Sequence, residues 1–168
     1  IMVFNDKLLE QYIDKESPET LRSLNILCVR LVFCLYAEDA GLFPSKTAFH
    51  DYLAPYPPQK IRRALIDLFE VLDTPIADRD PYLDEDLAAF PYVNGGLFDR
   101  HAGTQPSSAA EDLPHSGTSA YPIIIPQFTE ELKQLLLEKA MRGGVVQDVS
   151  GAISIIKCIS QYWLIQIG

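Results

Sequence analysis

Two adjacent carboxylates, Glu38 and Asp39, are the residues of this sequence that could form an acid–base pair. A small hydrolase could use two such groups to donate and accept a proton. Neighbouring residues on a helix point about 100° apart, however, so they cannot easily share one substrate atom. The structural alternative involves Arg30, which lies in an apolar stretch and needs a partner if it is buried. We favour this alternative and expect Arg30 to be buried and neutralised by Glu38 or Asp39 through a neighbouring segment.

The one compact basic cluster consists of Lys60, Arg62 and Arg63, within the sequence QKIRR. It could contact a phosphate backbone, or it could be the solvated face of a helix, which is the interpretation we favour. The formal net charge of −9 argues against nucleic-acid binding over a large surface. We therefore expect DNA to bind weakly, if at all, and through these three residues.

The cysteines and histidines form no recognisable metal motif. Cys28 and Cys34 are six residues apart on one expected helix, which places them on different faces, and a free cysteine is commonly a small buried side chain. The three cysteines suit a reducing, cytosolic setting better than a disulfide framework. Residues 131–133, ELK, match the end of a nuclease E-x-K motif, but a match this short arises by chance. We predict no catalytic, cofactor-binding or metal-binding residue in this chain.

The stretch FPYVNGGLFDR, residues 90–100, combines aromatics, an asparagine and two glycines. A phosphate-binding loop would need a preceding strand, a following helix and usually a lysine. The base-binding tetrapeptide of amino-methyltransferases needs Asn or Asp first, then two prolines and an aromatic, and the order here does not match. An asparagine followed by glycine is a strong turn signal because both residues tolerate positive φ. We therefore predict a structural turn at Asn94, Gly95 and Gly96.

Hydrophobic periodicity predicts that helices position these residues. The longest is expected from Pro18 to about Ala40, with Ser17 as N-cap and Gly41 as its end. Its apolar part, about fourteen residues long, is shorter than the roughly 20 residues of a membrane span, so it predicts a central core helix. Further helices are expected at 4–13, 48–53, 58–72, 83–90 and 128–140. The N-terminal residues lack the features of a signal peptide, so we expect a cytoplasmic protein without a membrane partner.

These elements predict a mainly α fold, a helical bundle around a long central helix, with room for a small β element. Residues 1–144 are expected to form one domain, which contains a flexible loop at 101–120. The sequence YPIIIP, residues 121–126, is expected to form an edge strand or an extended segment. The apolar tail, residues 145–168, fits a helix or a strand.

Three phrases carry a family resemblance: RLVFCLYAEDAGLFP at 30–44, IDLFEVLDTP at 66–75 and FPYVNGGLF at 90–98. Together they resemble the helical spacer region of MmeI-like DNA methyltransferases, which are large restriction-modification enzymes of bacteria. In that family the spacer lies between a nuclease part and an adenine-specific methyltransferase domain. The chain departs from the family's pattern after the helix at 128–140.

The resemblance implies a non-catalytic spacer that positions catalytic domains and lines part of the DNA path. Its partners would be the methyltransferase and nuclease domains of a parent protein, which would use S-adenosylmethionine. The family's nuclease, cofactor and N-P-P-Y motifs do not occur in this chain, so no catalytic role is carried onto its residues. The alternative function is an independent helical protein-interaction module.

Overall fold

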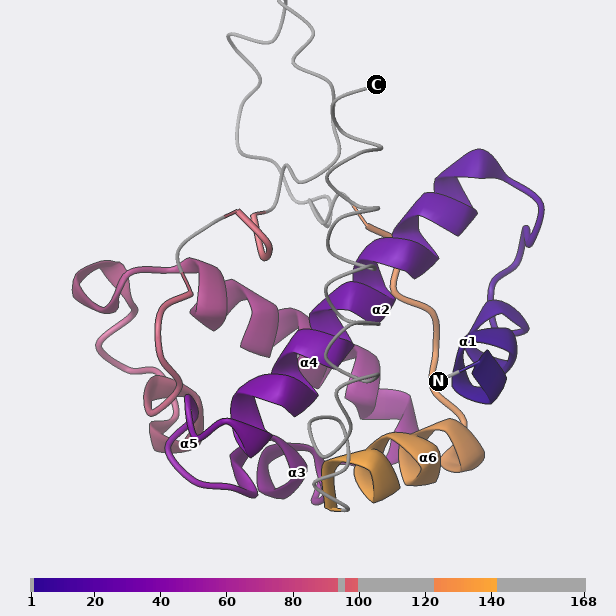
Figure 1. Ribbon diagram of the computed structural model, residues 1–168. Helices are drawn as coiled ribbons and strands as arrows, with labels where there is room; N and C mark the ends of the chain where they lie inside the picture. Colours follow the sequence, from indigo (N-terminus) through magenta and orange to yellow (C-terminus); the bar gives the residue numbers. More distant parts are fainter. Residues whose placement is uncertain (1, 94–95, 100–122, 142–168) are drawn as a thin grey trace, which may run out of the picture.

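The computed structural model describes residues 2–93, 96–99 and 123–141 (Figure 1). Within these ranges the chain is helical and contains no strand, which confirms the mainly α prediction. The predicted loop at 101–120, the domain boundary at 144 and the tail at 145–168 lie outside the described residues. The elements, in chain order, are α1 (Met2–Leu9), α2 (Pro18–Asp39), α3 (Ala48–Leu53), α4 (Pro58–Asp73), the 3-10 helix η1 (Ile76–Asp78), α5 (Glu85–Ala88) and α6 (Glu130–Met141).

Helix α2 begins and ends where the sequence predicts. Pro18 occupies the first turn, and Gly41 adopts a left-handed φ of 72° just beyond the C-cap. The Leu42 N–H donates to the Ala37 carbonyl at 2.8 Å, and the Gly41 N–H to the Glu38 carbonyl at 3.1 Å. This pair of bonds is a Schellman motif, which satisfies carbonyls at the helix end. Ser17 is the N-cap residue, but its side chain makes no capping hydrogen bond.

The fold is arranged around α2, which crosses the molecule from end to end (Figure 1). Its 22 residues correspond to about 33 Å. Helices α1, α3 and α6 all contact it, and α4 contacts both α5 and α6. Although α2 is long and apolar enough to cross a membrane, over half of its most apolar stretch is buried inside the fold. It is therefore the predicted core helix.

The other helices bury one side each, as their periodicity predicts. On α4 the buried set includes Ile61, Leu65, Leu68 and Phe69, while Lys60 and Arg63 on the same helix are exposed. On α6, Leu132 and Leu136 are buried and follow the buried Phe128. The short helix expected at 83–90 covers only Glu85–Ala88, and Leu87 and Phe90 bury their side chains there.

An extended segment, Ile123 to Pro126, passes between α1 and α2 before α6 begins (Figure 1). No strand pairs with it among the described residues, and side chains bind three of its backbone polar groups instead. Ile124 N–H donates to Ser23 Oγ at 3.0 Å, and the Tyr12 hydroxyl donates to the Ile124 carbonyl at 2.7 Å. Arg62 Nε donates to the Ile125 carbonyl at 2.7 Å. Residues 123–126 thus belong to no helix or strand, which agrees with the extended segment expected at 121–126, while residues 121 and 122 lie outside the described residues.

Candidate functional site

Arg30 lies at the centre of the fold and is completely buried. Its Nε donates to the Leu97 carbonyl at 2.9 Å, and its Nη2 donates to the Asp99 carbonyl at 3.0 Å. The guanidinium carbon also lies 5.4 Å from the centre of the Phe69 ring and 5.6 Å from that of Phe98. These distances are typical of cation–π contacts. Arg30 therefore joins α2 to α4 and to the segment that follows the predicted turn.

Burial of Arg30 is confirmed, but the prediction that Glu38 neutralises it is wrong. The side chains lie eight residues apart, which is about 12 Å along the helix axis. Asp39, nine residues away, is on the opposite side of the helix from Arg30. The carbonyls of Leu97 and Asp99 meet the guanidinium instead, 67 and 69 residues along the chain. Sequence reasoning considered only carboxylates as partners and so missed the carbonyls.

Glu38 is also completely buried, and its carboxylate binds the beginning of α3. Oε2 accepts hydrogen bonds from the backbone N–H groups of Phe49, at 2.6 Å, and His50, at 3.1 Å. These N–H groups belong to the first turn of α3, where the helix supplies no partner of its own. Because Thr47, the N-cap residue, makes no side-chain cap bond, Glu38 caps α3 from another element. This arrangement closes the loop between α2 and α3.

Burial raises the pKa of Glu38, and this effect outweighs the two N–H bonds, which favour the charged form. Burial likewise raises the pKa of Cys34, which is fully buried on the same helix. Neither side chain is accessible to a substrate in this conformation. The geometry therefore argues against a hydrolase built on Glu38 and Asp39.

The segment after the predicted turn packs against the core. Gly96 has a left-handed φ of 73°. Asn94 and Gly95, on which the turn prediction depends, lie outside the described residues. Phe98 is 1% exposed, and its ring lies 5.4 Å from that of Phe69 and 5.5 Å from that of Phe33. Residues 97–99 thus place the Phe98 ring in the core and two backbone carbonyls against Arg30.

The basic cluster divides between the surface and the interior. Lys60 is exposed at the beginning of α4, and Arg63 forms an ion pair with Asp67 at 2.7 Å. Arg62 is half-buried and binds the extended segment through Ile125. Only Lys60 and Arg63 are therefore well placed for an external phosphate, and Arg63 must share its charge with Asp67.

Arg79 is a structural residue that sequence reasoning missed. Its guanidinium donates to four backbone carbonyls: Thr74 at 3.1 Å, Val71 at 3.0 Å, Ala88 at 3.1 Å and Phe90 at 2.7 Å. Burial lowers its pKa. These bonds hold the C-terminal end of α4 against α5. The available signal was that Arg79 is the single cation among the six carboxylates of residues 73–86.

The ELK residues, set aside as a chance nuclease match, make structural contacts. Glu131 forms an ion pair with Lys7 of α1 at 2.6 Å, and Lys133 Nζ donates to the Ala54 carbonyl at 2.9 Å. They join α6 to α1 and to the end of α3.

The geometry defines a helical domain in which one buried arginine, Arg30, and two half-buried arginines, Arg62 and Arg79, bind backbone carbonyls of the same chain. Residues 22–98 match the family described as MmeI, helicase spacer domain. The resemblance identified from the three phrases is therefore confirmed.

Two known proteins are similar to this chain. DNA methyltransferase A of Bacillus subtilis (strain 168) is 41% identical over 83 residues, which cover 48% of this chain and 9% of that protein. The Type IIL restriction-modification enzyme MmeI, solved in complex with DNA, superimposes with a TM-score of 0.61 at 30% identity. That match covers 82% of this chain and 15% of the MmeI chain. The chain thus corresponds to a small part of each relative.

Proposed function

We propose that this chain is a non-catalytic spacer that holds the catalytic domains of a restriction-modification DNA methyltransferase at a fixed separation. The observation that carries the proposal is the superposition on a segment of MmeI, an enzyme solved with DNA. The parent protein would be cytoplasmic and would take its methyl group from S-adenosylmethionine. The nuclease and methyltransferase domains of the same polypeptide are the proposed partners.

The internal contacts support a rigid spacer. Helix α2 spans the domain, and arginines fix segments that a flexible linker would leave loose: Arg30 the segment after the turn, Arg62 the extended segment and Arg79 the end of α4. The carbonyls of Leu97 and Ile125 lie outside the helices, so the arginine bonds satisfy polar groups that no helix satisfies. The Val71 carbonyl at the end of α4 accepts from the Thr74 N–H as well as from Arg79. A domain built this way can keep its neighbouring domains at a fixed separation.

A graft into MmeI tests the spacer role. The MmeI segment that superimposes on this chain is replaced by the chain, and in a second variant by a flexible Gly/Ser linker of equal length. We expect the graft to methylate and to cut DNA at the same positions as unmodified MmeI assayed in parallel. The offset, defined as the distance from the recognition site to each cut, is compared between the two proteins. The linker, a random coil without fixed length, should give scattered cuts or none.

Mapping of the cut ends by sequencing supplies the measurement. An Arg30→Met graft lacks the hydrogen bonds from Arg30 to the carbonyls of Leu97 and Asp99, so its cut positions should be scattered like those of the linker variant. If a folded graft loses the offset, or the linker preserves it, the spacer role is wrong.

We expect the isolated chain to bind duplex DNA weakly, and this binding to disappear at about physiological salt, because the net charge of the chain is −9. Two phosphate contacts, made by Lys60 and Arg63, would give a salt slope of about −1.8. We expect Lys60→Glu with Arg63→Glu to abolish this binding, whereas Lys15→Glu with Lys46→Glu, an equal charge change at exposed sites, should weaken it less. Arg62 is left intact because it binds Ile125. Fluorescence anisotropy across a salt series measures the affinity for duplex DNA and its salt slope for the wild type and the two double variants. Tight binding at physiological salt would contradict the expected weak binding.

A further inference from the structure

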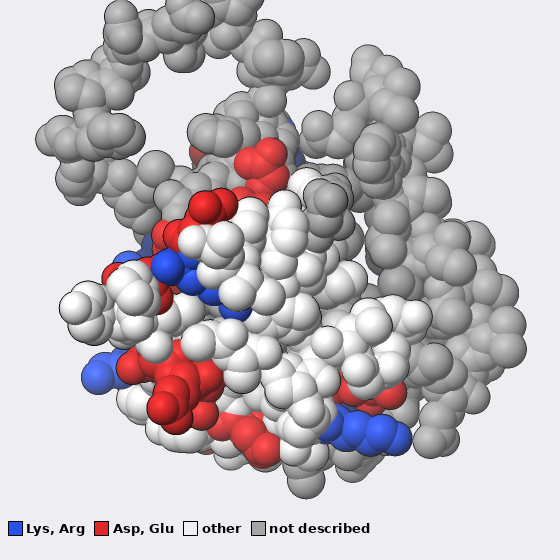
Figure 2. All heavy atoms as spheres, turned by 90° about the vertical axis from the view of Figure 1, so that its left-hand side faces the viewer, with Lys and Arg blue, Asp and Glu red and all other residues white. Residues whose placement is uncertain are grey.

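The connector between α4 and α5 exposes large apolar side chains among carboxylates. Tyr82 is 93% exposed and Ile76 is 71% exposed. Residues 73–86 contain six carboxylates and one arginine, and all of these carboxylates except Asp73 are exposed. Figure 2 shows this side of the molecule, on which acidic side chains gather in several groups among uncharged ones, with a few Lys and Arg side chains beside them. We call residues 76–86 the acidic connector.

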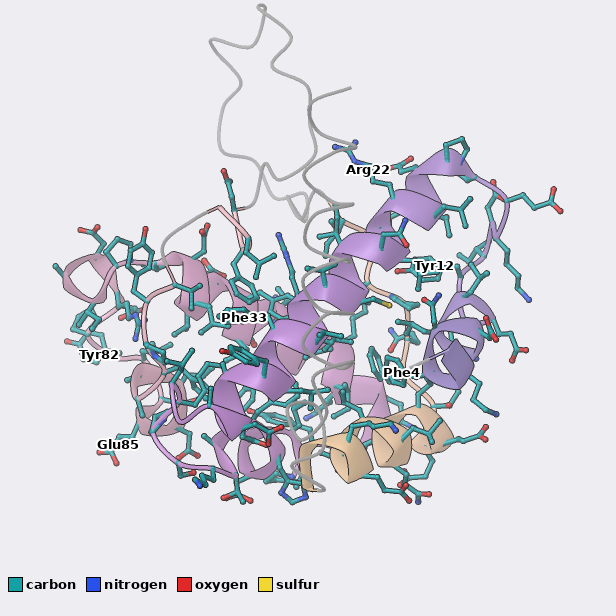
Figure 3. All side chains as sticks on the ribbon, in the orientation of Figure 1. Phe4, Tyr12, Arg22, Phe33, Tyr82 and Glu85 are labelled. Carbon is teal, nitrogen blue, oxygen red and sulfur yellow. The ribbon has the colours of Figure 1, made fainter. Side chains whose placement is uncertain are left out.

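The acidic connector keeps its negative charge because its arginine points inward. Four of the five N–H donors of Arg79 bind carbonyls of α4, α5 and their flanks. The connector's conformation is also held locally: Asp80 Oδ1 accepts from the Tyr82 N–H at 2.8 Å, and the Asp80 carbonyl from the Leu83 N–H at 3.1 Å. Tyr82 and Glu85 project outward at this end of the molecule (Figure 3). The backbone at Tyr82 is therefore held in place, while its side chain is exposed beside carboxylates and accessible to a partner.

The charge decides the kind of partner. Phosphates would be repelled by the carboxylates, so this end cannot line a DNA path. A protein surface with lysines or arginines around an apolar pocket would complement both features, since tyrosine is a frequent anchor of interfaces and the charges would set its orientation. The chain corresponds to 15% of the MmeI chain, so a spacer of this kind has large neighbouring domains in its own polypeptide.

We propose that the acidic connector docks onto a basic surface of a neighbouring domain in the same polypeptide, with Tyr82 as the anchor and Ile76 beside the carboxylates. The proposal rests on the spacer function and adds to it which side of the spacer faces a neighbouring domain. The acidic connector faces protein, and the DNA must pass elsewhere.

Site-specific photo-crosslinking in the MmeI graft tests the docking. Tyr82→p-benzoylphenylalanine is illuminated with a duplex containing the MmeI site, and crosslinked peptides are mapped by mass spectrometry. Gln59→p-benzoylphenylalanine, exposed at the other end of α4, is the control. We expect position 82 to crosslink within the polypeptide to a peptide rich in Lys or Arg. Asp84→Lys with Asp86→Lys should reduce that yield about tenfold.

The outcomes separate the two proposals. Crosslinks to DNA, crosslinks between two copies, no crosslink, or a yield unchanged by the charge reversal would each overturn the docking. A graft that keeps the cleavage offset while any of these occurs would leave the spacer function standing. A folded graft that loses the offset but crosslinks as expected would retain the docking surface and overturn the spacer function.

Discussion

Replacing Arg30 by methionine is expected to lower the free energy of unfolding by roughly 3–5 kcal/mol. Methionine fills part of the volume but donates no hydrogen bond, so the carbonyls of Leu97 and Asp99 lose the bonds from Arg30 inside the fold. The contacts with the rings of Phe69 and Phe98 are lost as well. Denaturant melts monitored by circular dichroism measure the change.

Two further variants make the Arg30 result specific. Arg30→Lys keeps the charge, but an ammonium group cannot reproduce the planar fork that reaches two carbonyls, so its stability should lie between those of the wild type and Arg30→Met. Arg22→Met alters an exposed arginine of the same helix and should stay within about 0.5 kcal/mol of the wild type. If Arg30→Met were as stable as the wild type, the hydrogen bonds and ring contacts of Arg30 would contribute nothing to stability.

Replacing Glu38 by alanine is expected to lower the free energy of unfolding by roughly 2–3 kcal/mol. The loss arises because the N–H groups of Phe49 and His50 lose the acceptor that caps α3. Glu138→Ala, at an exposed position of α6, is the matched control and should change stability by less than about 0.5 kcal/mol. An alanine variant as stable as the control would contradict the capping role.

The pH dependence of a second variant, Glu38→Gln, tests the buried carboxyl itself. Because the folded-state pKa of Glu38 is raised, the native protein binds more protons than the unfolded chain between the ordinary and the raised pKa. The contribution of Glu38 to stability is therefore fully present below the ordinary pKa and falls as pH rises through this range. Glutamine, which cannot ionise, lacks this dependence.

Urea melts of the wild type and Glu38→Gln across this pH range measure the difference. We expect the glutamine variant to gain stability relative to the wild type as pH rises, since all other titrating groups are shared. A difference independent of pH, or one of opposite sign, would mean that the pKa of Glu38 is not raised in the folded protein.

Local sequence determined the helices of this protein and most of their ends. Pro18 fits only the first turn of a helix, and Gly41 takes the left-handed conformation that ends α2, because both effects act within a few residues. The buried faces of α4 and α6 follow from periodicity in the same way. The exposure of Lys60 and Arg63 agrees with a solvated helix face, which was the favoured interpretation of the basic cluster.

Only the tertiary structure decided what the charged residues bind. The sequence placed Arg30 in an apolar stretch, and burial followed, but its partners are carbonyls of the chain nearly 70 residues away. Any carbonyl can accept such a bond, so no residue type at those positions could identify them. The same holds for Glu38, which caps a helix 11 residues further on, and for Arg79, whose four acceptors come from two helix ends. Backbone acceptors have no sequence signature, and their positions become defined only when the helices have packed.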